Sequence, residues 1–161
     1  MHIQVVLAAA NPRGTTHLQL DEEVRRIETQ LARSEYAHVL RGSGERPAPI
    51  VLRSLWAAQL ADLVRDVTAF APEVVQFSGH GQGKDGLLMV GDDGAERPIS
   101  GKSLAQVLGE FAATTRLVIL NTCHSKVQAD AICQVIDCVI GMKHEIGDSA
   151  AALFVSALYG Q

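Results

Sequence analysis

Short apolar runs alternate along this chain with segments in which apolar residues recur every three or four positions. Residues 3–10, 73–79 and 116–122 are nearly continuous apolar runs of strand length, which is typical of strands buried on both faces. The segments 20–31 and 100–111 carry an apolar face at helical spacing instead. This alternation predicts an α/β domain with a mainly parallel sheet and helices on both faces.

Less regular segments complete the predicted order of elements, and turn residues and candidate caps set their limits. In chain order we expect a short strand at 36–41, a loop at 42–49, a helix capped by Ser54 with Trp56 on its apolar face, a hairpin within 86–99, a helix beginning at Ser100, a helix over 125–134, a strand over 135–142 and a last helix from about Asp148.

Composition limits the class of protein. The chain has 161 residues, 47% of them hydrophobic, so we expect residues 1–161 to form a single domain around one core. Its net charge of −4 argues against nucleic acid as a partner. The late apolar stretch 150–160 is shorter than the roughly 20 residues that span a bilayer. Three cysteines without a paired framework fit a reducing compartment, so we expect a soluble, cytoplasmic protein without a membrane partner.

A glycine-rich loop follows the strand at 73–79. Gly81, Gly83 and Gly86 match the G-x-G-x-x-G pattern of dinucleotide-binding loops. That pattern binds phosphate only where a helix opens directly after it, because the amides of the helix N-terminus contact the anion. A hairpin pattern follows here. We therefore predict a turn rather than a nucleotide site, and no cofactor.

Two reactive side chains stand where two apolar strands end. His80 follows the strand at 73–79, and Cys123 follows the strand at 116–122. The hairpin and helix between them are long enough for a crossover that joins neighbouring parallel strands. Adjacent strands lie about 4.8 Å apart. His80 and Cys123 are therefore expected side by side at one rim of the sheet, where an imidazole can take a thiol proton.

The surroundings of this pair favour acyl-transfer chemistry. A helix beginning near Ser125 would stabilise a Cys123 thiolate, and the N–H groups of Gly81 and Cys123 are natural donors to an oxyanion. Each residue also has an ordinary structural explanation. A cysteine at a strand end is often a small buried hydrophobe, and a histidine there often binds loop backbone.

Four blocks of the chain resemble the CHAT domain family of caspase-like cysteine peptidases. They are VVLAAANPRGTTHLQLDEEVRRIE, PEVVQFSGHG, LVILNTCHS and VIGMKHEIGDSAA, in that order. The resemblance implies a caspase-like three-layer sandwich in which His80 is the general base and Cys123 the nucleophile of a cysteine endopeptidase. It also implies a protein or peptide substrate, a sensor or regulatory domain or partner, and an effector role in bacterial signalling or defence.

The sequence departs from the family pattern at three places. Thr122 and His124 flank the cysteine where relatives commonly have a small and an aromatic residue. His124 either perturbs Cys123 or points into solvent. The sequence ends at Gln161, where relatives usually continue, so we expect a domain that lacks C-terminal elements. An alternative follows, a catalytically silent caspase-like module for protein interaction.

The resemblance also suggests a charged pocket, with Asp148 and Glu145 as candidate substrate-binding acids and a basic residue before the scissile bond. The cap of the last helix is the other role open to Asp148. Cys133 and Cys138 are expected in the core. Zinc bound by His80, Cys123 and His124 would need a fourth ligand that the spacing does not supply, so we predict no metal.

Overall fold

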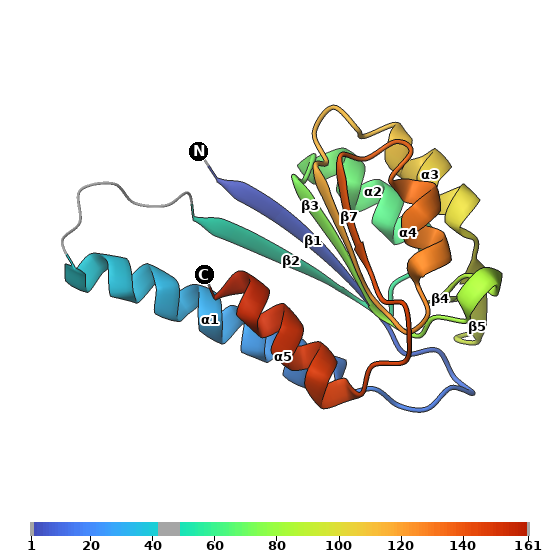
Figure 1. The fold of residues 1–161 in the computed structure, drawn as a ribbon, viewed down its shortest axis with the longest axis horizontal. Coiled ribbons are helices and arrows are strands. Elements are labelled where there is room, and N and C mark those ends of the chain that lie inside the picture. The colour runs from blue at the N-terminus through green and yellow to red at the C-terminus, as the bar shows by residue number, and fades with distance from the viewer. Residues whose placement is uncertain (1, 42–48, 161) are drawn as a thin grey trace.

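The computed structural model describes the backbone of residues 2–41 and 49–160, and the side chains of these residues except 35–41. Strands and helices alternate along most of the chain (Figure 1). The elements are β1 Ile3–Ala10, α1 Leu20–Arg41, β2 Ile50–Trp56, α2 Leu60–Phe70, β3 Val74–Gly79, the short 3-10 helix η1 Gly83–Asp85, β4 Leu87–Val90, β5 Glu96–Ile99, α3 Gly101–Gly109, β6 Leu117–Asn121, α4 Lys126–Ile132, β7 Cys138–Gly141 and α5 Asp148–Tyr159.

The predicted three-layer α/β architecture is confirmed. Five strands form one parallel sheet in the order β2-β1-β3-β6-β7, and β4 and β5 form a separate antiparallel hairpin. Helices α1 and α5 cover one face of the sheet, and α2, α3 and α4 cover the other (Figure 1). The sheet order changes direction at β1, so the carboxyl ends of β1, β3 and β6 form one rim where an α/β fold commonly binds its ligands.

Each face of the sheet has its own apolar cluster. Leu7, Ile27 and Val155 are fully buried between the sheet and α1/α5. On the opposite face, Leu104 and Ile132 are fully buried beneath α3 and α4. Residues of β1 contribute alternately to both clusters, which explains why that strand reads as a continuous apolar run.

Two predictions of secondary structure were wrong. Residues 36–41 are the end of α1, not a strand, because neither glycine nor proline interrupts the sequence from Leu20 to Arg41. Ser54 caps no helix and lies within β2, which pairs with β1 over seven residues and ends at the exposed Trp56. Ala57 then adopts a left-handed φ of 49°, and α2 begins only at Leu60. The loop predicted at 42–49 falls, except for its last residue, outside the described residues.

The second half of the chain follows the prediction more closely. The hairpin is present, and the Ser100 side chain accepts a hydrogen bond from the Ser103 N–H at the start of α3. The assignment of Cys133 and Cys138 to the core was wrong, because both are exposed. Cys133 follows the last residue of a short helix, and Cys138 begins an edge strand. Within the described residues, no helix is long and apolar enough to cross a membrane.

Candidate functional site

His80 and Cys123 extend from two neighbouring parallel strands. The last register pair of β3 and β6 joins Ser78 to Asn121, so His80 and Cys123 each come two residues after this pair. Both line one pocket at the rim of the sheet, and α1 and the start of α5 form its other walls. The structure therefore brings together the two residues that the sequence analysis paired.

The His80 ring is oriented by the loop after β1. Its Nε2 lies 2.6 Å from the carbonyl oxygen of Thr16. Asn11 holds this loop through two hydrogen bonds with the Leu18 backbone, of 2.8 and 3.1 Å. Because a carbonyl oxygen can only accept, Nε2 carries a proton. In the neutral ring Nδ1 is then the nitrogen free to act as a base.

The Cys123 thiol contacts the segment that precedes α5. Its Sγ accepts from the Ile146 N–H at 3.5 Å and lies 3.7 Å from the Ile146 carbonyl oxygen. The fully buried Ser125 fixes the turn that carries Cys123. Its Oγ lies 2.9 Å from the Thr122 carbonyl oxygen and accepts from the Met142 N–H at 2.9 Å. The thiol is thus half-buried, and the segment that follows β7 holds both the thiol and the turn that carries it.

No hydrogen bond joins His80 to Cys123 among the described residues. The imidazole faces the pocket with Nε2 bound to loop backbone, and the thiol is bound to Ile146.

The described side chains also include no group of three or more His, Cys, Asp or Glu residues that could hold a metal ion.

Gly81 is packed directly against the Cys123 backbone. A Cβ placed on Gly81 would lie 2.0 Å from the Cys123 carbonyl oxygen, so only glycine fits at this position. The N–H groups of Gly81 and Cys123 donate no hydrogen bond within the part of the chain that the structure describes. The other glycines belong to the turn: Gly83 and Gly86 have φ of +57° and +126°, and β4 follows them.

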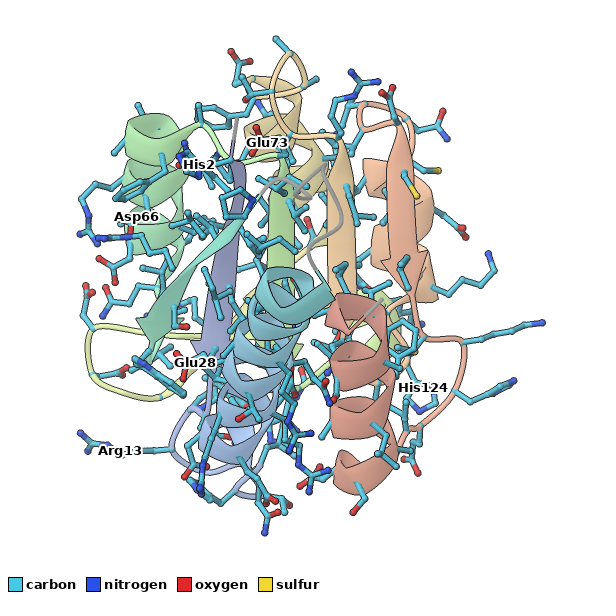
Figure 2. The ribbon with its side chains drawn as sticks, turned by 90° about the vertical axis from the view of Figure 1, so that its left-hand side faces the viewer. His2, Arg13, Glu28, Asp66, Glu73 and His124 are labelled. Carbon is cyan, nitrogen blue, oxygen red and sulfur yellow. The ribbon has the colours of Figure 1, made fainter. Side chains whose placement is uncertain are left out.

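His124 is the exposed neighbour of the candidate nucleophile (labelled in Figure 2). It has a left-handed φ of +51°, which costs a non-glycine residue about 1–2 kcal/mol. Its Nε2 lies 3.9 Å from a carboxylate oxygen of Glu145, whose side chain is 86% exposed. The imidazole therefore faces solvent and Glu145.

The two predicted acids lie in different places. Asp148 lines the pocket together with His80 and Cys123, whereas Glu145 does not. The prediction that Asp148 caps the last helix was wrong. Gly147 occupies the N-cap position of α5, and Asp148 is the first helical residue with an exposed side chain.

The sequence model of the CHAT domain family matches residues 2–161 of this chain. The chain belongs to the CHAT domain family. It is also similar to a curated protein named Roc-COR-CHAT protease from an unknown prokaryotic organism, with 24% identity over 166 aligned residues. The alignment covers 97% of this chain and 14% of that protein, so this CHAT domain corresponds to a small part of its relative.

A buried carboxyl group that the sequence analysis missed lies in the pocket of this CHAT domain. Glu23 of α1 is 5% exposed, and its Oε1 accepts from Ser78 Oγ at 2.6 Å and from Gln76 Nε2 at 3.0 Å. The Tyr159 hydroxyl donates to Gln76 Oε1 at 3.0 Å. Burial raises the pKa of Glu23, and the nearby charge of Asp148 adds to this, against hydrogen bonds that lower it.

Polar atoms without partners lie in the same pocket as Glu23. Both polar atoms of the Asn121 side chain and the Oγ1 of Thr122 are buried without a hydrogen-bond partner among the described atoms, and both residues line the pocket. Asn121 lies beside the carboxyl group of Glu23. A buried polar group without a partner costs about 1–3 kcal/mol, so a polar ligand group would bind favourably beside it.

The sequence contained a signal for Glu23. It stands three residues after Leu20 and four before Ile27, so it lies on the apolar face of its helix. An acid in that position points into the protein rather than into solvent.

Proposed function

We propose that this CHAT domain is a cysteine endopeptidase in which Cys123 is the nucleophile and His80 the general base. The observation that carries the proposal is the placement of both residues in one pocket, at the ends of the adjacent parallel strands β3 and β6. Family membership and the protease name of the relative support it.

The reaction begins with transfer of the Cys123 thiol proton to His80 Nδ1. The Cys123 sulfur then forms a bond with the substrate carbonyl carbon. As the C–N bond breaks, His80 returns the proton to the leaving amine and a thioester remains. Water then gives a proton to His80 while its oxygen bonds to the thioester carbon. The C–S bond breaks, the acid leaves, and His80 returns the proton to the Cys123 sulfur. The missing direct bond between thiol and imidazole is compatible with a scissile amide that lies between them.

The oxyanion is assigned to two backbone donors. The N–H groups of Gly81 and Cys123 lack acceptors in the described structure, and the contact between these two residues holds them together. Donors fixed in advance stabilise charge that develops in the transition state, and removing one typically costs about 100- to 1,000-fold in rate.

We assign the side-chain specificity of the pocket to a basic residue. Among the described residues that line it, Glu22, Glu23 and Asp148 stand against a single basic side chain, Arg26. A guanidinium or ammonium group between Glu23 and Asp148 would relieve the repulsion between these carboxylates and supply donors to Asn121. Glu145 lies outside this lining, so it serves as the comparison residue rather than as the pocket acid.

The cellular setting is also a proposal. The relative's name joins a CHAT domain to Roc and COR, and we propose that the present domain likewise works beside a sensor or regulatory domain, as an effector of a bacterial signalling or defence system in the cytoplasm.

A catalytically silent interaction module is the second candidate function. The observation in its favour is the Cys123 thiol, which is bound to the Ile146 backbone and not to His80. The two functions differ in thiol reactivity. A peptidase requires Cys123 to react with iodoacetamide faster than a model thiol does, whereas a silent module does not.

A fluorogenic peptide library with basic and acidic residues varied before the scissile bond tests the proposal. We expect cleavage after arginine or lysine and at least a roughly 1,000-fold loss in Cys123→Ala and His80→Ala, while Cys133→Ala, which removes an exposed cysteine, keeps full activity. Asp148→Asn should lower kcat/KM for basic peptides, and Glu145→Gln should not. Cleavage that persists in Cys123→Ala would exclude the mechanism, and a preference for acidic residues would exclude the pocket assignment.

A further inference from the structure

A groove between α1 and α5 begins at the catalytic pocket and leads away from it. Figure 2 shows these two helices side by side across one face of the sheet. The groove has a volume of about 430 Å³, which is within the usual range of about 300–1,000 Å³ for ligand sites. Its α1 wall is Glu22, Arg25, Arg26, Thr29, Gln30 and Arg33, and its α5 wall is Leu153 and Ser156.

The charge of this groove is opposite to that of the chain. Three arginines face one glutamate there, although the whole chain carries a net charge of −4. Arg26 is paired with Glu22 at 2.7 Å. Arg25 and Arg33 have no ion-pair partner among the described side chains, so two guanidinium groups remain for a ligand carboxylate. Arginine binds carboxylates through two parallel hydrogen bonds.

The groove also offers an apolar contact. Leu153 on α5 is 61% exposed, more than any other large hydrophobic side chain among the described residues. An apolar side chain that covers Leu153 would gain from burial, while flanking carboxylates pair with the arginines.

The groove and the pocket form one continuous surface, because Glu22 and Arg26 line both. Arg33 lies seven residues beyond Arg26 on the same helix, and at 1.5 Å per residue this is about 10 Å. An extended peptide covers about 10 Å in three residues.

We propose that this arginine groove (Arg25, Arg26 and Arg33 with Leu153) binds an acidic segment of the protein substrate. The segment lies about three to six residues from the residue held in the pocket. The inference rests on the proposed function for two points, that the segment belongs to a substrate and that the pocket holds a basic residue of the same substrate.

Binding is measured by fluorescence anisotropy with Cys123→Ala, so that no cleavage is needed. The parent probe is a peptide with one arginine for the pocket. It is extended on one side or on the other with glutamates placed three to six residues from that arginine. In the control version of each extension, glutamines replace the glutamates. We expect the glutamate version of one extension to bind roughly tenfold tighter than its glutamine version. Arg25→Glu with Arg33→Glu should remove this difference, whereas Arg97→Glu with Lys102→Glu, the same charge change at exposed sites on β5 and α3, should keep it.

The outcomes separate this inference from the proposed function. If wild type cleaves peptides but glutamate extension changes neither the dissociation constant nor KM, the groove proposal is wrong and the peptidase remains. If no peptide is cleaved, the anisotropy comparison still reports on the groove. Loss of binding in both double variants, or equal binding of a single-stranded oligonucleotide, would indicate general attraction of polyanions and overturn the proposal. Circular dichroism melting curves check that each variant is folded.

Discussion

A single methyl group at position 81 tests the geometry of the candidate site directly. In Gly81→Ala the new Cβ would lie 2.0 Å from the Cys123 carbonyl oxygen and 3.3 Å from Thr122 Oγ1. A side-chain Cβ essentially never lies within 3.0 Å of another heavy atom. One of the two strand-end segments must therefore move by at least about 1 Å, and these segments carry the proposed base and nucleophile.

The size of the effect follows from this displacement. A 1 Å misplacement in an active site can cost about 100-fold in rate, so we expect kcat/KM of Gly81→Ala to fall at least about 100-fold. Overpacking costs about 1–3 kcal/mol, which for a chain of this length lowers Tm by roughly 2–12 °C. Initial rates with the best library peptide, measured well below the Tm of the variant, separate loss of geometry from unfolding.

Gly109→Ala is the matched control. Its Cβ would meet Val135 at 3.6 Å, an ordinary contact, in the last residue of α3. Because alanine is a better helix former than glycine, this variant should keep its rate and melt no earlier than wild type. If Gly81→Ala retains more than about a tenth of wild-type kcat/KM, Gly81 does not position the Cys123 backbone and the reasoning is refuted.

Three further predictions concern the same region. Burial holds the pKa of Glu23 above its ordinary 4.5, so the folded protein keeps a proton that the unfolded chain loses, and this carboxyl destabilises the fold as pH rises through its folded pKa. The Tm of Glu23→Gln should therefore rise relative to the Tm of wild type as the pH increases above 4.5. A Tm difference that does not change with pH would contradict this expectation. At position 124, relief of the left-handed φ should make His124→Gly at least as stable as wild type in urea unfolding, by up to about 1–2 kcal/mol. His124→Val should be less stable than wild type, because a β-branched residue tolerates a positive φ least; the reverse order would show that the side chain, not φ, matters. Ser125→Ala leaves the Met142 N–H without its acceptor and should cost about 1–3 kcal/mol together with activity, and an unchanged midpoint would argue against a role in holding the Cys123 turn.

The neighbouring placement of His80 and Cys123 could be predicted from sequence for a simple reason. Each follows a continuous apolar run, and only a hairpin and a helix separate the two runs. Parallel strands joined by such a short crossover are usually adjacent, and β3 and β6 are. The start of α2 could not be read in the same way. Trp56 precedes Leu60 and Leu63 at helical spacing, which favours an earlier start of the helix. Trp56 lies in β2 instead, because residues 50–56 pair with β1.

The buried part of the site was harder to predict, because a residue's chemistry does not show which partners it meets. Three acids in the first turn of α1 all complement the helix dipole. The helical spacing places Glu23 on the apolar face, but it does not show that Ser78 and Gln76 of β3 hold its carboxylate below the surface. The carbonyl group of Thr16, which orients the His80 ring, belongs to an irregular loop and has no sequence signature.

The bonds that Ile146 and Met142 make to the Cys123 segment have a consequence for the order of events during synthesis. The thiol is held by the Ile146 N–H, and the turn beneath it by the Met142 N–H. Both donors are translated about twenty residues after the cysteine itself. A growing chain on the ribosome therefore cannot organise its nucleophile when β6 emerges, but only after β7 has joined the edge of the sheet and Ile146 has left the exit tunnel. The fold itself delays the assembly of the candidate nucleophile until the sheet is complete.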